Sequence, residues 1–285
     1  MSEYIKGILL TATGVLVLSF DGLLILLISA DSFTLLFWRG LLLSVSVVVL
    51  LMLQKPTQPF MPMDAASLRS SFFMTVSTIA FVMSINLSSV ANVLVIISSQ
   101  PLFAAILGWL FLREMPKPVT WAAIVLSMLG IAWVLLGSWS EPNFLGDMLA
   151  LLCCVSLAAK FVNDRAVSHR DMTPPLILAG LAVALVSLFM GNPMALSGDS
   201  WWYMVLLCLF VSPIAFCLIT IGPMRIPAAE VGMLMLLETA VGPVWVWLVL
   251  NDIPSATAVQ GGSLVVGTLL LHSLYQWRSR QKRTS

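Results

Sequence analysis

Charged residues are scarce in this sequence, and that scarcity excludes most soluble folds. Asp, Glu, Lys and Arg make up only 9% of the 285 residues, whereas a soluble domain carries about 25%. Hydrophobic residues make up 60%, and the mean hydropathy is +1.02. No soluble core could bury so much apolar sequence, so we expect the lipid bilayer to be the solvent of this chain.

The residues that most enzyme chemistry requires are also few. The formal net charge is only +1, so nothing favours a nucleic-acid partner. The sequence has neither an H-E-x-x-H motif nor a Gly-rich phosphate loop. The histidines and cysteines lack the spacing of a metal site, and the cysteines lie in apolar runs where packing is their expected role: His169, His272, Cys153, Cys154, Cys208 and Cys217. We therefore predict no enzyme activity, no cofactor and no metal.

Long apolar runs predict an all-α integral membrane protein with ten transmembrane helices. A barrel would alternate polar and apolar residues, which these runs do not do. Each helix needs about 20 residues to span the bilayer, so ten leave only short loops. The expected spans are 5–29, 33–53, 68–87, 91–112, 119–137, 145–163, 174–190, 201–220, 229–250 and 257–276.

The distribution of basic residues predicts the orientation of these helices. If the N-terminus is inside, thirteen of the fourteen Lys and Arg residues fall on inner segments, and only Arg39 does not. Cytoplasmic loops carry the excess of Lys and Arg in membrane proteins. Both termini are therefore expected in the cytoplasm.

One stretch of the sequence occurs twice. With a shift of 138, WLFLREMP at 109–116 aligns with WLVLNDIP at 247–254. The chain then divides into a five-helix repeat at 1–138, a second at 139–276, and a basic cytoplasmic tail at 277–285. Because five is odd, the second repeat enters the membrane upside down, so the two repeats are inverted.

With ten spans, this repeat and its W-L-x-L-x-acid ending, the chain resembles the drug/metabolite transporter superfamily, EamA type. The resemblance implies a bacterial cytoplasmic (inner) membrane protein, similar to amino-acid and aromatic amino-acid exporters. It also implies a central cavity lined mainly by spans one, three, four, six, eight and nine. In that family a proline often follows an acid directly in span nine, whereas here Thr239 follows Glu238.

Glu238 and Gln100 are the first candidates for a substrate site. They occupy equivalent positions in the two repeats, and both fall near the middle of the membrane. Glu238 could contact a substrate amine or exchange a proton, or it could be a structural acid that holds helices together. Helical spacing places Trp245 on the same face of span nine, and we expect Trp109 and Trp247 to pack or face lipid.

Asp21 and Arg39 are expected to form an ion pair. Asp21 lies about 12 Å from the outer end of its span and Arg39 about 9 Å, at about 1.5 Å per residue. Their depths agree, and pairing is the simplest way to hold both charges in the bilayer. The pair could be structural, a gate, or a contact for a substrate carboxylate.

Hydroxyl side chains and one lysine complete the candidates. Ser77, Ser84 and Ser99 in spans three and four could line a cavity, although small hydroxyl residues also serve close helix packing. Lys160 lies near the inner end of span six, and we expect its amine to snorkel to the interface.

The leading hypothesis is a secondary exporter of a small amphipathic metabolite, an amino acid or related amine, working by alternating access. The partners would be that substrate, the bilayer and a coupling proton, in a monomer or a homodimer. A cationic drug exporter that uses Glu238 and tryptophans is the alternative. An intramembrane enzyme or a channel is disfavoured by the inverted repeat.

Overall fold

All regular elements described in the computed structural model are helices. The structure describes residues 3–28, 30–54, 63–88, 93, 96–136, 144–196, 198, 200–250 and 256–284. The first half contains α1 (Glu3–Leu18), α2 (Asp21–Leu27), α3 (Ser32–Gln54), α4 (Ala65–Leu87), α6 (Gln100–Leu112) and α7 (Pro118–Leu136). The second half contains α8 (Phe144–Ala166), α9 (Pro175–Met190), η1 (Pro193–Ala195), α10 (Ser200–Val205), η2 (Leu206–Val211), α11 (Ser212–Arg225), α12 (Ala228–Leu250) and α13 (Ala256–Thr284).

These helices match the ten predicted spans of a membrane protein. Span one comprises α1 and α2, and span eight comprises α10, η2 and α11. Among the described residues, five helices are long and apolar enough to cross a membrane by themselves, and shorter apolar helices lie between them. The predicted fold class is therefore confirmed.

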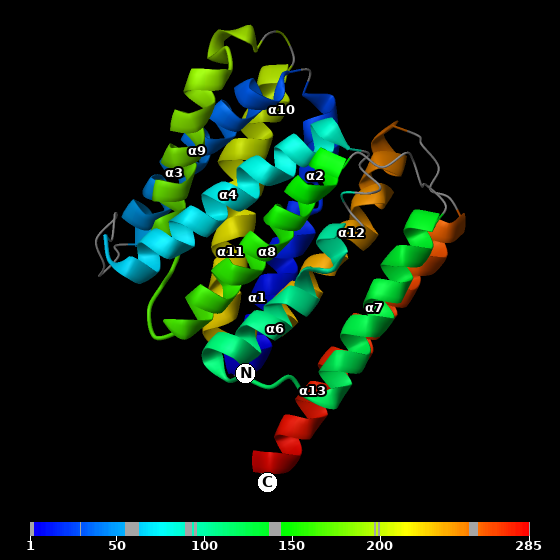
Figure 1. Ribbon diagram of the computed structural model, residues 1–285. Helices are drawn as coiled ribbons and strands as arrows, with labels where there is room; N and C mark the ends of the chain where they lie inside the picture. Colours follow the sequence, from blue (N-terminus) through cyan, green and yellow to red (C-terminus); the bar gives the residue numbers. More distant parts are fainter. Residues whose placement is uncertain are drawn as a thin grey trace.

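The packing of the helices follows an inverted two-fold pattern. The first span of each half packs on the third span of the other half, so that α1 packs on α11 and α8 packs on α4. The remaining spans each pack on the equivalent span of the other half, α3 on α9, α6 on α12 and α7 on α13. Figure 1 shows the α7–α13 pair lying side by side at one edge of the molecule.

Small residues let the helix pairs approach closely, as is usual in membranes. At the α3–α9 contact a Cβ on Gly40 would lie 2.4 Å from the carbonyl oxygen of Gly180. The Ser44 hydroxyl donates to the carbonyl of Ile177 in the same contact. Any larger side chain at Gly40 would separate the two halves.

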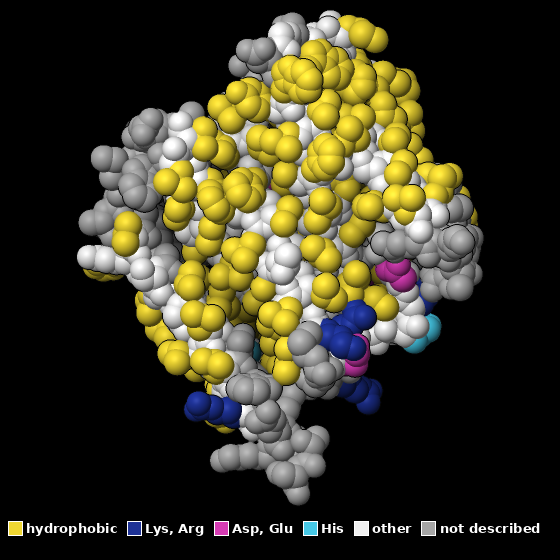
Figure 2. Space-filling view, turned by 180° about the vertical axis from the view of Figure 1, so that it is seen from behind, with side chains coloured by type: hydrophobic (Ala, Val, Ile, Leu, Met, Phe, Trp, Pro, Cys, Tyr) yellow, Lys and Arg dark blue, Asp and Glu magenta, His cyan; other side chains and the backbone are white. Residues whose placement is uncertain are grey.

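Both ends of the chain lie at one end of the molecule, which we call the basic end (Figure 1). Arg225 contacts Glu3 there at 3.1 Å, and Arg165 contacts Glu114 at 2.9 Å. Figure 2 shows that, on one face, hydrophobic side chains cover the middle while the visible Lys and Arg side chains gather toward this end.

Three details differ from the sequence-based expectation. Span one is broken, because a turn at Ser19 and Phe20 separates α1 from α2. In span eight, η2 is a stretch of π-helix in which the N–H of Ser212 donates to the carbonyl of Leu207. α13 runs to Thr284, so the expected tail continues the last helix because its Lys, Arg and Gln residues are good helix formers.

Candidate functional site

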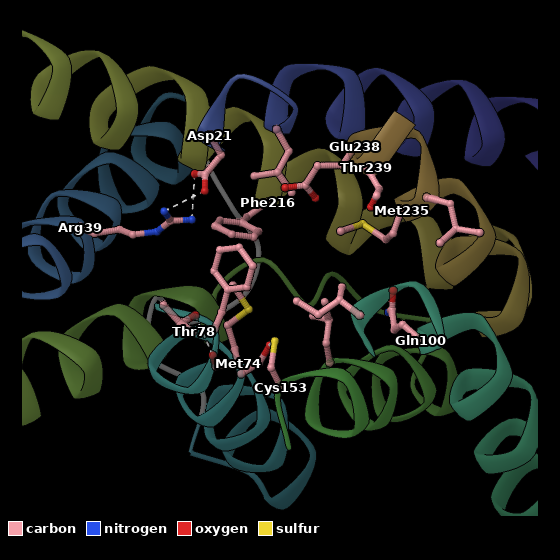
Figure 3. Close-up of a pocket in the computed structure, with 16 residues that line it drawn as sticks. Asp21, Arg39, Met74, Thr78, Gln100, Cys153, Phe216, Met235, Glu238 and Thr239 are labelled. Carbon is pink, nitrogen blue, oxygen red and sulfur yellow. Dashed lines mark hydrogen bonds and ion pairs between the residues drawn. The ribbon is translucent and has the colours of Figure 1, made fainter. Parts of the chain in front are cut away.

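A cavity of about 80 Å³ lies between the two halves. Helices α1, α2, α3, α4, α6, α8, α11 and α12 contribute to its walls. It brings together five of the predicted residues, Asp21, Arg39, Ser77, Gln100 and Glu238. Figure 3 shows Gln100 and the Asp21–Arg39 pair on different sides of this space, with the Phe216 ring between them.

Helix breaks place two of the polar groups in the cavity. Asp21 is in the first turn of α2, directly after the turn that ends α1. Gln100 is in the first turn of α6, followed by Pro101, which supplies no N–H donor. Such breaks in membrane helices are tolerated where the backbone lines a cavity. A carboxylate is also favoured at a helix N-terminus, which suits Asp21.

Asp21 and Arg39 form the predicted ion pair. The Nη2–Oδ1 distance is 2.9 Å and the Nη1–Oδ2 distance is 3.0 Å, so the guanidinium meets the carboxylate with both terminal nitrogens. The two residues are only 2% and 4% exposed. The Arg39 guanidinium carbon also lies 6.0 Å from the centre of the Phe216 ring, which brings α11 to the pair. The charges compensate each other inside the protein.

Glu238 and Gln100 face the same cavity from equivalent helices of the two halves. Gln100 is 1% exposed, and its Nε2 has no hydrogen-bond partner among the described residues. Glu238 is half-buried beside Thr239 and Met235, which also line the cavity (Figure 3). The site therefore offers a free amide donor and a carboxyl group.

Ser84, Ser99 and Trp245 do not line this cavity, contrary to the prediction. The Ser84 hydroxyl donates to the carbonyl of Phe81, and the Ser99 hydroxyl donates to the carbonyl of Ile96. Serine hydroxyls inside helices commonly bond back in this way, which removes them from a cavity.

Trp245 instead packs at the break in span one. Its indole N–H donates to the Ser19 hydroxyl at 2.7 Å, and its ring stacks on Phe20 with centroids 4.2 Å apart. Trp109 is 48% exposed, as expected of a lipid-facing residue. The side chain of Trp247 and the residue Asp252 of the repeat ending lie outside the described residues.

Several cavity residues were not among the sequence candidates. Phe81, Met74 and Phe216 form much of its apolar wall, and Cys153 contributes a thiol 3.4 Å from the Ser77 hydroxyl. Met74 and Phe81 lie three residues before and four residues after Ser77, so the predicted Ser77 already marks their face of α4. Phe216 and Cys153 had no such neighbour among the predicted lining residues.

Lys160 does not snorkel, and this prediction was wrong. It is 2% exposed, and its amine lies 2.6 Å from the Asp164 carboxylate one helical turn later. The amine also donates to Thr220 of α11, and the Ser70 hydroxyl of α4 donates to Asp164. Hydroxyl groups from two other helices therefore complete this second buried pair on α8, so the amine does not need the interface.

Comparisons with known proteins agree with this architecture. Residues 5–136 and 144–274 each match the model of the EamA-like transporter family. A solved crystal structure of a protein that is 16% identical in sequence has a TM-score of 0.84 and covers 95% of this chain and 98% of its own. Among curated proteins, none matches the chain significantly.

The buried ion pairs lie at similar positions in the two matched segments. Asp21 and Lys160 are at nearly the same distance from the segment starts at residues 5 and 144, and the repeat shift of 138 aligns Asp21 with Ala159, the neighbour of Lys160. Each residue anchors a buried pair that reaches α11, through Phe216 in one case and Thr220 in the other. Because the halves are inverted, one pair lies toward the basic end and the other lies toward the opposite end.

Proposed function

Since the chain belongs to the EamA-like transporter family, we propose that it exports a small amphipathic metabolite, an amino acid or related amine, by secondary active transport. The proposed setting is the bacterial cytoplasmic membrane, with both termini in the cytoplasm. In alternating access the cavity opens first to one side of the membrane and then to the other, as an inverted repeat permits.

The observation that carries this proposal is the charge of the central cavity. Asp21 and Arg39 neutralise each other at 2.9 Å, so Glu238 supplies the uncompensated acid among the residues that line the cavity. A substrate ammonium group would balance it, while Gln100 would donate a hydrogen bond to a substrate oxygen. Leu18, Met74 and Phe81 would hold the apolar part of the molecule.

The same acid supports a proton as the coupling ion. Glu238 can hold a proton or an ammonium group, and a carboxylate in an apolar cavity needs one of the two. If substrate and proton compete for Glu238, uptake of a proton from outside would release the substrate. Export would then be driven by the proton gradient.

A cationic drug is less well supported as the substrate. That alternative uses tryptophan rings as a cation site, but Trp245 is occupied by Phe20 and Ser19. Drug-sized ligands generally occupy pockets of about 300–1,000 Å³, whereas the cavity measures about 80 Å³.

An efflux panel tests the proposal. Cells that express the protein would be loaded with each of the twenty amino acids, the matching decarboxylated amines, and a set of cationic dyes. We expect faster export, relative to cells without the protein, only for compounds that carry an amine and a small apolar group. Export of the dyes alone, or of none of the compounds, would contradict the proposal.

A further inference from the structure

A second cavity lies at the basic end of the molecule, and the proposed central site does not use it. Its volume is about 270 Å³, larger than that of the central cavity. It lies between the end of α6, the end of α8, and the starts of α7 and α12. We call it the basic-end cleft, and its charged lining consists of Glu114, Lys117, Arg165 and Glu230.

Only one helix crossing separates this cleft from the central cavity. α6 and α12 meet where a Cβ on Gly232 would lie 3.0 Å from the Cα of Pro101. Gln100 and Met235 line the central cavity on one side of the crossing, while Ala105 and Ala229 line the cleft on the other. The cleft therefore lies on the path from the basic end to the central site.

Small residues keep the cleft open. Ala104, Ala105 and Gly108 of α6 face Ala228 and Ala229 of α12 across it. A Cβ built on Gly108 meets no atom within 4 Å. The space is thus part of the packing of α6 and α12, and it is about the size of the smallest ligand pockets.

The cleft contains a guanidinium group held in a fixed position. Arg165 Nε donates to Glu114 at 2.9 Å, and Nη1 donates to the carbonyl of Pro223 at 3.3 Å. No hydrogen bond joins Nη2 to the described residues, and the side chain is 23% exposed. An arginine held in this way can bind a carboxylate with little further loss of side-chain freedom.

We propose that the basic-end cleft is a second substrate site, which binds the carboxylate of a small metabolite through Arg165 before the α6–α12 crossing opens. The inference rests on the proposed export function, because the basic end faces the cytoplasm only in that orientation. It also narrows the substrate class, since a simple amine lacks the group that Arg165 binds. The central cavity would then receive a molecule that carries both charges.

Cysteine protection tests the proposal. The four native cysteines would be replaced by serine, and Gly108→Cys would place a thiol in the cleft, where the Cβ has room. A membrane-impermeant methanethiosulfonate would be added to the basic-end side of inside-out vesicles. Leucine, 3-methylbutylamine and 4-methylpentanoate would serve as probes, because they share a side chain and differ in the charged groups. Phenylalanine and methionine, with their matching amines and acids, would extend the set.

We expect the amino acids and the carboxylic acids to slow labelling at least threefold, and the amines to have no effect. Arg165→Gln should abolish the protection, and Arg165→Lys should retain it at higher probe concentration, which shows that the fold survives. Arg69→Gln is the matched control, since it removes an exposed basic residue at the same end and should leave protection unchanged.

The central site and the cleft can be told apart in the Glu238→Gln background. Protection that persists there but disappears in Arg165→Gln supports a separate site. Protection that disappears in Glu238→Gln but persists in Arg165→Gln overturns the proposal of a separate site, because labelling of the Gly108→Cys thiol then depends only on binding in the central cavity. If no probe protects the thiol, the proposal of a site in the basic-end cleft is also overturned. The proposed export function is decided separately, by the efflux panel.

Discussion

Asp21 and Arg39 illustrate what a charged side chain needs inside a membrane. Each would be costly alone, and together they place both terminal nitrogens of the guanidinium within 3.0 Å of the carboxylate oxygens. Lys160 meets the same requirement with Asp164, at 2.6 Å. Removing one partner leaves the other charge buried without compensation, whereas removing both does not.

A double-mutant cycle tests whether Asp21 and Arg39 stabilise each other. Asp21→Asn and Arg39→Gln should each lower the free energy of unfolding by about 3–5 kcal/mol, as breaking a buried pair generally does. The double variant should lose clearly less than the sum of the two single losses. Denaturation of the purified protein in detergent measures all three. Strictly additive losses would show that the two side chains do not stabilise each other.

The sequence predicts the charged part of the site better than the apolar part. Asp21 and Arg39 could be paired from their depths along two spans, and Glu238 and Gln100 from the repeat. Phe216 and Cys153 were not placed, because an apolar side chain in a membrane helix looks the same in the sequence whether it lines a cavity, packs on a neighbouring helix or faces lipid. Lys160 was misplaced although its ion-pair partner Asp164 lies one helical turn away in the sequence. The Thr220 hydroxyl that also accepts from its amine, and the Ser70 hydroxyl that donates to Asp164, come from helices far away in the sequence.

At the scale of helices, the sequence shows the spans but not their interruptions. The apolar runs give most helix ends to within a few residues, since hydropathy responds to side chains, whereas the polar continuation of α13 to Thr284 escapes it. The break at Ser19 and the π-helical stretch before Ser212 are backbone features, which hydropathy does not report. Both lie in helices that line the central cavity, where discontinuous helices are common in transporters.

Gly232 provides a test of the close contact between helices α6 and α12. A Cβ there would lie 3.0 Å from the Cα and 3.4 Å from the backbone nitrogen of Pro101, neither of which can rotate away. Gly232→Ala should therefore separate α6 from α12 and lower the free energy of unfolding by about 1–3 kcal/mol. Gly242→Ala on the same helix is the control, because its Cβ would have its nearest neighbour at 3.8 Å.

Thermal unfolding of both glycine variants in detergent measures the difference. Gly242→Ala should be neutral or slightly stabilising, since alanine favours a helix more than glycine does. Equal stability of the two variants would mean that α6 and α12 are not in close contact at Pro101.

At the scale of the whole molecule, the inverted repeat relates the two halves of the site. α6 and α12 are equivalent helices that pack on each other, and each directs a polar side chain, Gln100 or Glu238, into one cavity. A site placed in this way can stay fixed while the halves move around it. The repeat could be predicted from the sequence. Which of its residues face each other could not, because that depends on how the helices cross.

The most direct test of this account is the efflux rate of Glu238→Gln, measured with an exported amino acid at several external pH values and at equal expression. Because glutamine keeps the shape but cannot bind a proton or neutralise an ammonium group, we expect at least a tenfold loss of export and a flattened pH dependence. Gln100→Glu added to this variant should restore part of the rate, since it returns the carboxyl group to the same cavity from the equivalent helix. Unchanged efflux in Glu238→Gln at every pH would show that Glu238 is a structural acid and that the transport site lies elsewhere.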